Sequence, residues 1–140
     1  MGNKILIIDD NLASAEALAA VLDMVGHPAQ IAHGAVEGLH AVASFKPNLV
    51  FLDLGMPEMN GYQVAARIRG DANVEQPYLI AYTAWDDQAT IKLTAAAGFD
   101  RHIAKTTPFE GLVEAIRRVA ALRLERVQTQ ALKAVAQPVD

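Results

Sequence analysis

The sequence predicts an α/β fold built on a doubly wound parallel sheet, and three observations support this fold class. Short apolar segments alternate with longer segments of helical period, in a strand–helix order that is repeated five times. Residues 4–9 and 49–53 are apolar runs that end in aspartate, and such runs are typical of strands covered on both faces. Glycine or proline marks several of the turns between segments. We therefore expect a parallel sheet with helices on both sides.

The individual elements follow from apolar runs and from signals at helix ends. The expected strands lie at residues 4–9, 29–32, 49–53, 78–83 and 101–104. Asn11 can cap the first helix, residues 26–28 (Gly-His-Pro) end it, Lys46-Pro47 ends the second, and Gly98 ends the fourth. The expected helices lie at residues 12–25, 34–45, 62–69 and 87–97, with a fifth beginning near Pro108.

The chain beyond Ala121 carries more helix than a five-unit α/β domain needs. We expect one domain over residues 1–121 and a C-terminal helical extension or linker over residues 122–140. The extension has three readings: an exposed continuation of the last helix, a dimerisation helix, or a linker to a partner domain.

Composition narrows the class of protein. A chain of 140 residues has the length of one domain, and no run approaches the roughly 18 apolar residues of a membrane-spanning helix. Its first residues do not resemble a signal peptide, and cysteine is absent, so we expect a cytoplasmic protein without a membrane partner. The net charge of −4 argues against direct binding of nucleic acid.

Polar side chains of a few types stand at the C-terminal ends of four predicted strands. They are Asp9, Asp10, Asp53, Thr83 and Lys105. The C-terminal ends of parallel strands meet at one edge of the sheet, so these groups are expected to converge there. Carboxylates that lie close together repel one another, and a bound hard cation removes the conflict. Oxygen ligands point to Mg²⁺, with Mn²⁺ or Ca²⁺ as alternatives, and Asp10 and Asp53 fit the demand of Mg²⁺ for one or two carboxylates.

The same groups suit phosphoryl transfer. Asp53 is the expected nucleophile and gives an acyl phosphate. Lys105 and the Thr83 hydroxyl can each bind a peripheral oxygen of the incoming group, which carries the negative charge.

At this point the sequence resembles the receiver domain of two-component response regulators. The matching segments are residues 7–11 (IIDDN), 53–61 (DLGMPEMNG), 82–84 (YTA) and 97–100 (AGFD), followed by Lys105. The resemblance covers roughly residues 4–120, and the residues of these segments are most similar to those in the receivers of hybrid sensor histidine kinases. It implies a five-stranded parallel sheet in the order 2-1-3-4-5, flanked by five helices.

The resemblance also implies roles for single residues. Asp53 is the phosphorylation site. Asp10, Asp53 and the backbone carbonyl of Gly55 bind Mg²⁺ directly, whereas Asp9 acts through water. Thr83 and Lys105 match the pair that contacts the phosphoryl group.

The implied protein is a signalling phosphoacceptor and not an enzyme on an external substrate. It catalyses only its own phosphorylation and dephosphorylation. Its phosphoryl donor is a sensor histidine kinase or a histidine phosphotransfer protein. The phosphorylated form presents the face of the fourth helix, fifth strand and fifth helix to a downstream protein, and a homodimer can form through the C-terminal helix.

Three positions depart from the family pattern or extend it. Lys105 is followed by Thr106 where proline is usual, often in a cis bond, so we expect a trans bond and a reshaped loop. His102 stands where Tyr or Phe is usual, and it is a candidate pH-sensitive switch. Trp85, two residues after Thr83, is a candidate barrier to the water that removes the phosphate.

Three other functions compete with this reading. A phosphohydrolase of the haloacid dehalogenase type needs an aspartate where Gly55 stands. An interaction module that has lost phosphorylation is disfavoured because the acidic residues, Thr83 and Lys105 are all present. An FMN-binding flavodoxin-like protein needs a phosphate loop after the first strand, where Asp10-Asn11-Leu12 stands instead.

Overall fold

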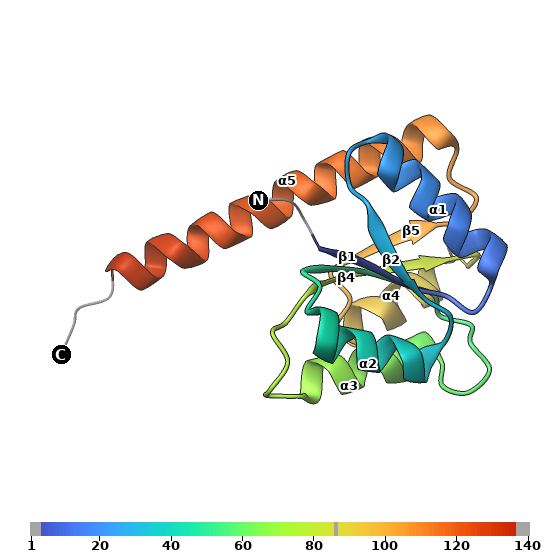
Figure 1. Cartoon of the computed structure of the whole chain (residues 1–140), viewed down its shortest axis with the longest axis horizontal. Coiled ribbons are helices and arrows are strands. Elements are labelled where there is room, and N and C mark those ends of the chain that lie inside the picture. Colours follow the sequence, from blue (N-terminus) through green and yellow to red (C-terminus); the bar gives the residue numbers. More distant parts are fainter. Residues whose placement is uncertain (1–3, 86, 137–140) are drawn as a thin grey trace.

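The computed structural model describes residues 4–85 and 87–136, with side chains described to Arg118 and at Ala121, Thr129, Leu132 and Lys133 beyond it. Five strands and five helices alternate along the described chain (Figure 1). The strands are β1 (Ile5–Ile8), β2 (Ala29–Ala32), β3 (Leu49–Leu52), β4 (Tyr78–Thr83) and β5 (Arg101–Ala104). The helices are α1 (Leu12–Met24), α2 (Ala35–Phe45), α3 (Gly61–Gly70), α4 (Gln88–Ala96) and α5 (Phe109–Ala136). Each lies within one or two residues of its expected position.

The strands form one sheet in the order β2-β1-β3-β4-β5, and every neighbouring pair is parallel. The predicted fold class and strand order are thus confirmed. In-register pairing places Ile8 beside Leu52, so β1 and β3 end together and the aspartates that follow them are neighbours. The central strands β1 and β3 are buried along their whole length, as their uninterrupted apolar sequences predict.

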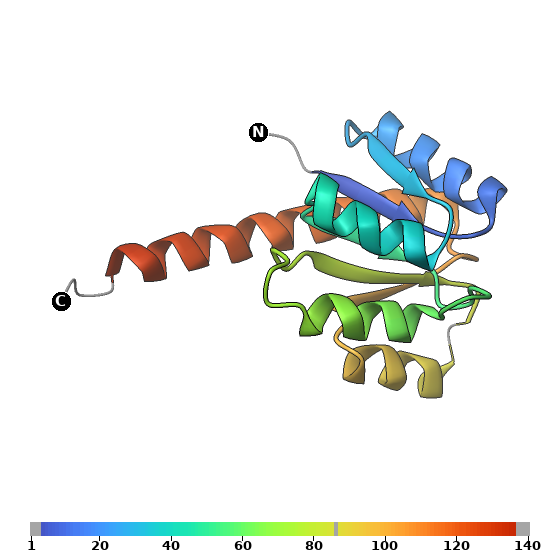
Figure 2. The ribbon, with the colours of Figure 1, turned by 60° about the horizontal axis from the view of Figure 1, so that its bottom comes forward.

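Two apolar cores lie on the two faces of the sheet. One face packs against α2 and α3, with Leu6, Ile8 and Val64 among the buried residues. The other packs against α1 and α5, with Ile7, Phe51 and Ile116. Figure 1 shows α1 and the start of α5 on one side of the sheet and α2, α3 and α4 on the other, and in Figure 2 α2 and α3 lie in front of the strands. Successive strand residues point to opposite faces, which is why Ile7 and Ile8 belong to different cores.

Helix starts near the site are fixed by side-chain caps. The Asn11 side chain accepts a hydrogen bond from the Ser14 N–H at 3.0 Å, as the sequence predicts for the first helix. At the start of α3, the Asn60 side chain accepts from the Gln63 N–H while the Gln63 side chain accepts from the Asn60 N–H, both at 3.0 Å. The loops that carry the candidate site are therefore held at their helical ends.

Helix α5 is the longest element, with 28 residues. Its first part packs against α1, and Leu112 and Ile116 are buried in the core. Figure 1 shows the second part leaving the body of the domain as a single projecting helix. No helix among the described residues is long and apolar enough to cross a membrane.

Candidate functional site

The sheet edge where β1 and β3 end carries a cluster of three carboxylates. One oxygen each of Asp9, Asp10 and Asp53 lies within 4.8 Å of the others. Asp9 and Asp53 are buried, whereas Asp10 is exposed. The topology therefore brings together the three acidic residues that the sequence singled out.

Lys105 supplies the positive charge of this cluster. Its Nζ lies 2.8 Å from Oδ2 of Asp9 and 3.6 Å from Oδ1 of Asp53. The other oxygen of Asp9 accepts a hydrogen bond from the Asn11 N–H at 3.0 Å. Both oxygens of Asp9 thus have a protein donor, while Asp53 has a more distant cation.

This environment changes the acidity of Asp53. Burial raises the pKa of Asp53 from 3.8 to about 6, and the neighbouring Asp9 carboxylate adds to the rise, while Lys105 opposes it. Burial also works against the charge on Lys105, but the hydrogen bond to Asp9 and the charges of Asp53 and Asp9 outweigh it, so the pKa of Lys105 lies above 10.5. Lys105 therefore stays charged at neutral pH.

The loop after Asp53 passes very close to the start of α3. A Cβ added at Gly61 would lie 2.8 Å from the Leu54 Cα and would also meet the Asp53 carbonyl oxygen. The Gly61 N–H donates to the Leu54 carbonyl at 2.9 Å. The absence of a side chain at Gly61 thus lets α3 begin directly beneath the backbone of Asp53.

Trp85 lies beside the same loop. Its ring is 3.0 Å from where a Cβ of Gly55 would stand, so the indole passes directly over that glycine. The side chain is 54% exposed and forms part of the rim of the site. The structure therefore places Trp85 next to the predicted metal-binding loop.

Thr83 ends β4 and is fully buried. Its Oγ1 lies 3.4 Å from the Trp85 N–H, which donates to it. The hydroxyl is thus engaged with the backbone of the loop between β4 and α4.

His102 on β5 contacts that same loop. Its Nε2 lies 2.7 Å from the Trp85 carbonyl oxygen. A Phe at this position has no hydrogen-bonding group for this carbonyl, and a Tyr has only the hydroxyl at the far end of its ring. The edge strand and the β4–α4 loop are therefore joined by one hydrogen bond.

The peptide bond after Lys105 is as expected from Thr106. No peptide bond among the described residues is cis, so the Lys105–Thr106 bond is trans. The Lys105 N–H donates to the Thr83 carbonyl at 2.7 Å, and the Thr107 N–H donates to the Ala104 carbonyl at 3.0 Å. Lys105 reaches the carboxylates without the proline that usually follows it.

One neighbour of the site was given no role from the sequence, although it belongs to the matching segment 82–84. Tyr82 precedes Thr83 on β4, and the Lys105 Nζ lies 5.8 Å from the centre of its ring. An aromatic residue inside an apolar strand carries no signal of its own, because core packing explains it equally well.

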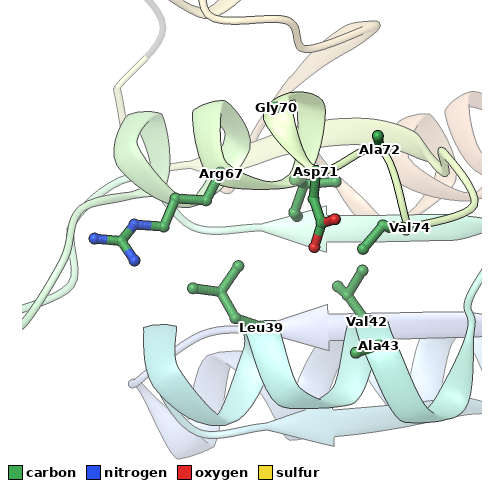
Figure 3. A pocket seen from close by; sticks show the side chains of 9 residues that line it. Leu39, Val42, Ala43, Arg67, Gly70, Asp71, Ala72 and Val74 are labelled. Atoms are coloured by element: carbon green, nitrogen blue, oxygen red, sulfur yellow. The ribbon is translucent and has the colours of Figure 1, made fainter.

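A separate cavity of about 610 Å³ lies between α2 and α3 (Figure 3). Leu39 and Val42 line it from α2, and Asp71 and Val74 from the segment after α3. It lies at the end of α3 that leads to β4, whereas Asp53 lies near the start of α3. None of the predicted site residues lines this cavity.

Comparisons with known proteins agree on one family. The sequence model of the response regulator receiver domain matches residues 5–117. The chain is 32% identical over 117 residues to the response regulator MprA of Mycobacterium tuberculosis, and 33% to the DNA-binding response regulator MtrA of Mycobacterium bovis. Both alignments cover 84% of this chain and 50% of the relative, so the chain spans about half the length of these relatives.

Solved structures show the same fold. A CheY-like receiver domain protein from Methanospirillum hungatei superposes with a TM-score of 0.79 at 24% identity, covering 90% of this chain and 99% of that one. The BeF₃-activated receiver domain of RstA from Klebsiella pneumoniae gives 0.75 at 26% identity, covering 82% and 96%.

Proposed function

This chain belongs to the response regulator receiver domain family, and from that membership we propose that Asp53 is the residue that accepts the phosphoryl group. A receiver domain is a phosphoacceptor in two-component signalling and implies a histidine kinase as partner. The observation that carries the assignment to Asp53 is its place directly after β3, in one cluster with the two other carboxylates and 3.6 Å from Lys105.

The proposed reaction is a displacement at phosphorus. A carboxylate oxygen of Asp53 forms the new O–P bond as the P–N bond of the phosphohistidine breaks, and the electron pair of that bond stays on the imidazole nitrogen. The pKa of about 6 leaves Asp53 ionised at neutral pH, so it is able to attack.

Two residues are proposed to bind the transferred group. Lys105 lies within 3.6 Å of Asp53 and donates to one phosphoryl oxygen. Thr83 donates its hydroxyl to another phosphoryl oxygen while it still accepts from the Trp85 N–H, because a hydroxyl donates and accepts at once. Through this contact, phosphorylation would be coupled to the β4–α4 loop.

We propose Mg²⁺ as the cofactor, and the donor set of the site fits it. Three carboxylates offer oxygen ligands only, against the single ammonium of Lys105. Asp10, Asp53 and the Gly55 carbonyl would hold the ion directly. Asp9 would act through water, since both of its oxygens already accept protein hydrogen bonds. The ion supplies electrostatic stabilisation of the negative charge on the transferred group.

The finer description of partners follows the same reasoning. The donor is a sensor histidine kinase or a histidine phosphotransfer protein, and the α4–β5–α5 face meets a downstream protein. Direct nucleic-acid binding is not proposed for this domain, although one relative is named DNA-binding. We propose that the protein is cytoplasmic and has no membrane partner. We also propose a domain over residues 1–121 and an extension over residues 122–140, in which the projecting part of α5 can form a homodimer contact.

Two residues are proposed to tune the phosphorylated state. Trp85 over Gly55 narrows the path of the water that would hydrolyse the aspartyl phosphate, and hence slows self-dephosphorylation. His102 holds the Trp85 carbonyl and so keeps the β4–α4 loop in place. Protonated His102 keeps an N–H for this carbonyl, whereas the neutral ring does so only in one tautomer.

Intact mass after incubation with acetyl phosphate and Mg²⁺ tests the function. We expect one phosphate adduct that requires Mg²⁺ and is absent in Asp53→Asn. Asp100→Asn, at the far end of the sheet, is the control and should retain the adduct. An adduct that survives in Asp53→Asn would show that another residue is the acceptor.

The decay of that adduct tests the tuning residues. Trp85→Ala should lose phosphate several-fold faster than the wild type, whereas exposed Leu93→Ala on α4 should not. His102→Phe should change the decay rate, because it removes the hydrogen bond to the Trp85 carbonyl. Equal decay of the wild type and Trp85→Ala would eliminate the barrier role.

A further inference from the structure

Lys105 depends on neighbours other than its loop for the direction of its side chain. The Lys105 N–H is hydrogen-bonded to the Thr83 carbonyl. The next residue is Thr106, joined by a trans bond, and it lacks the rigid ring with which a proline would restrict the loop. A lysine side chain has four rotatable bonds and loses much of its rotamer entropy when it is held in one direction. Something else has to restrict where its Nζ lies.

The Lys105 ammonium has an aromatic neighbour in addition to the carboxylates of Asp53 and Asp9. The Tyr82 ring lies 5.8 Å from Nζ, within the ~6 Å range of attraction between a cation and an aromatic face. Tyr82 is 9% exposed, and Lys105 is itself only partly exposed, so water screens this attraction weakly. The contact therefore lies within the range of a cation–π interaction, in surroundings that are largely shielded from water.

The ring of Tyr82 is itself held in place. It meets the Phe51 ring edge to face, with centroids 6.2 Å apart and planes at 88°. Phe51 is 1% exposed and lies on β3, two residues before Asp53. Because Tyr82 and Thr83 are successive residues of β4, their side chains point to opposite faces of the sheet. Tyr82 thus faces the α1–α5 core, and its ring is held in a fixed position next to the Lys105 ammonium.

We propose that Tyr82 is a positioning residue for the phosphoryl transfer, which acts through its ring by holding the Lys105 ammonium at the acceptor carboxylate. When the phosphoryl group arrives, Lys105 exchanges its contact with Asp9 for a phosphoryl oxygen, and the ring limits how far Nζ moves. This inference rests on the proposed function of Asp53 and adds a residue that the site chemistry does not itself require.

The test compares ring-retaining and ring-deleting variants in the initial rate of phosphate uptake from acetyl phosphate with Mg²⁺. Tyr82→Phe should react within about twofold of the wild type, and Tyr82→Leu roughly three- to tenfold more slowly. Tyr78→Leu is the matched control: it makes the same change at the other end of β4, beside the same core, and should leave the rate unchanged.

Two further readouts separate positioning from general damage to the fold. In a Lys105→Met background, Tyr82→Leu should cause no additional loss of rate, because its effect passes through Lys105. The Lys105 ε-methylene protons should show an upfield ring-current shift in the wild type and Tyr82→Phe that Tyr82→Leu abolishes. This shift is measured without donor or Mg²⁺.

The outcomes distinguish the two proposals. A wild type that takes up no phosphate overturns the assignment of Asp53, and with it the role of Tyr82. A wild type that is phosphorylated while Tyr82→Leu reacts equally fast overturns the inference about Tyr82 alone. The inference is also overturned if Tyr82→Leu lowers the uptake rate as much in the Lys105→Met background as it does in the wild type.

Discussion

At the scale of single residues, the site is defined by charges that are unequally compensated. Asp9 is buried and accepts hydrogen bonds at both oxygens, one of them from Lys105 at 2.8 Å. Asp53 lies 3.6 Å from the same ammonium, beyond hydrogen-bond distance. Of the two buried carboxylates, the one with less protein compensation is therefore the one proposed to bind the metal and the phosphoryl group.

This imbalance makes the stability of the protein depend on pH. Because the pKa of Asp53 is about 6 in the folded protein and 3.8 without burial, the folded state holds the proton more tightly. The contribution of Asp53 is favourable below pH 4 and is lost as pH rises through 6. Between pH 4 and 7 we expect the wild type to lose about 1–2 kcal/mol of unfolding free energy relative to Asp53→Asn, since solvent screens part of the shift.

Denaturant unfolding of both proteins without Mg²⁺, across this range, measures the difference. Asp71→Asn, whose carboxylate lies outside the cluster, serves as the control and should follow the wild type. A difference between the wild type and Asp53→Asn that does not change with pH would contradict the raised pKa.

Metal binding can be followed through Trp85, the only tryptophan of the chain. Its ring passes over Gly55, so its fluorescence should change when Mg²⁺ binds and return when EDTA removes the ion. Asp10→Asn should weaken Mg²⁺ binding at least about tenfold, because a direct carboxylate ligand is lost. Asp23→Asn on α1 should bind as the wild type does, and a similar loss in both variants would indicate a general effect of charge.

At the scale of elements, the start of α3 decides where the backbone of Asp53 lies. Gly61 begins the helix in contact with Leu54 and the Asp53 carbonyl, and the Asn60–Gln63 capping box fixes the helix end. The position of the acceptor therefore depends on a helix that contributes no side chain to the chemistry.

Gly61→Ala should consequently impair both stability and phosphorylation. Its Cβ has backbone atoms as neighbours, which cannot rotate away, so we expect a loss of about 1–3 kcal/mol in unfolding free energy and slower phosphate uptake. Gly70→Ala is the control at the other end of α3, where a Cβ meets nothing within 4 Å. Unfolding curves and the uptake rate should separate the two, and equal behaviour would show that the backbone adapts.

Arg69 joins three elements at the opposite edge of the sheet. Its guanidinium donates to the carbonyls of Gly98 and Pro77, and to the side chains of Gln76 and Asp100, each at 2.9 Å. The end of α3 is thereby tied to the turn after α4 and to the segment that leads into β4. This network stabilises the packing of α3 against the segments that precede β4 and β5.

Arg69→Met should lower the unfolding free energy by about 2–4 kcal/mol, because it removes the cation that pairs with Asp100 and the donors to the Gly98 and Pro77 carbonyls. Arg67→Met, on the exposed side of the same helix, should change it by less than about 0.5 kcal/mol. Thermal or denaturant unfolding measures both, and comparable losses would mean that the network carries little energy.

At the scale of the whole molecule, the packed part of the chain ends before its last helix does. Leu112 and Ile116 are the buried residues of α5 among those whose side chains the structure describes, and Figure 1 shows the helix continuing well past the sheet. The side chain of Leu132 is 70% exposed. A lone helical projection of this kind gains little from tertiary packing.

Ending the chain after Ala121 should therefore leave the domain intact. We expect the unfolding free energy to change by less than about 1 kcal/mol and phosphate uptake to be unaffected, since both cores and all site residues are retained. If residues 122–140 form a dimer contact, sedimentation should show a loss of dimer in the shortened chain. Unfolding of the shortened domain would contradict the boundary at residue 121.

The sequence by itself determined the fold class, every strand and helix, and the residues of the acidic cluster. It could do so because apolar runs on β1 and β3 must be buried on both faces, and parallel strands bring their C-terminal ends together. The resemblance to receivers added the strand order. The exception was the long α5, whose role the sequence left open among three readings.

Only the tertiary structure decided how the charges of the site compensate one another. The contacts that decide this lie between residues distant in the chain. Lys105 lies near Asp9, Asp53 and the Tyr82 ring, and His102 contacts the Trp85 carbonyl. Sequence periodicity reports which face of an element is buried, but not which side chains meet across elements. That depends on packing between neighbouring elements, where a single rotamer decides whether an ammonium lies nearer one carboxylate than another.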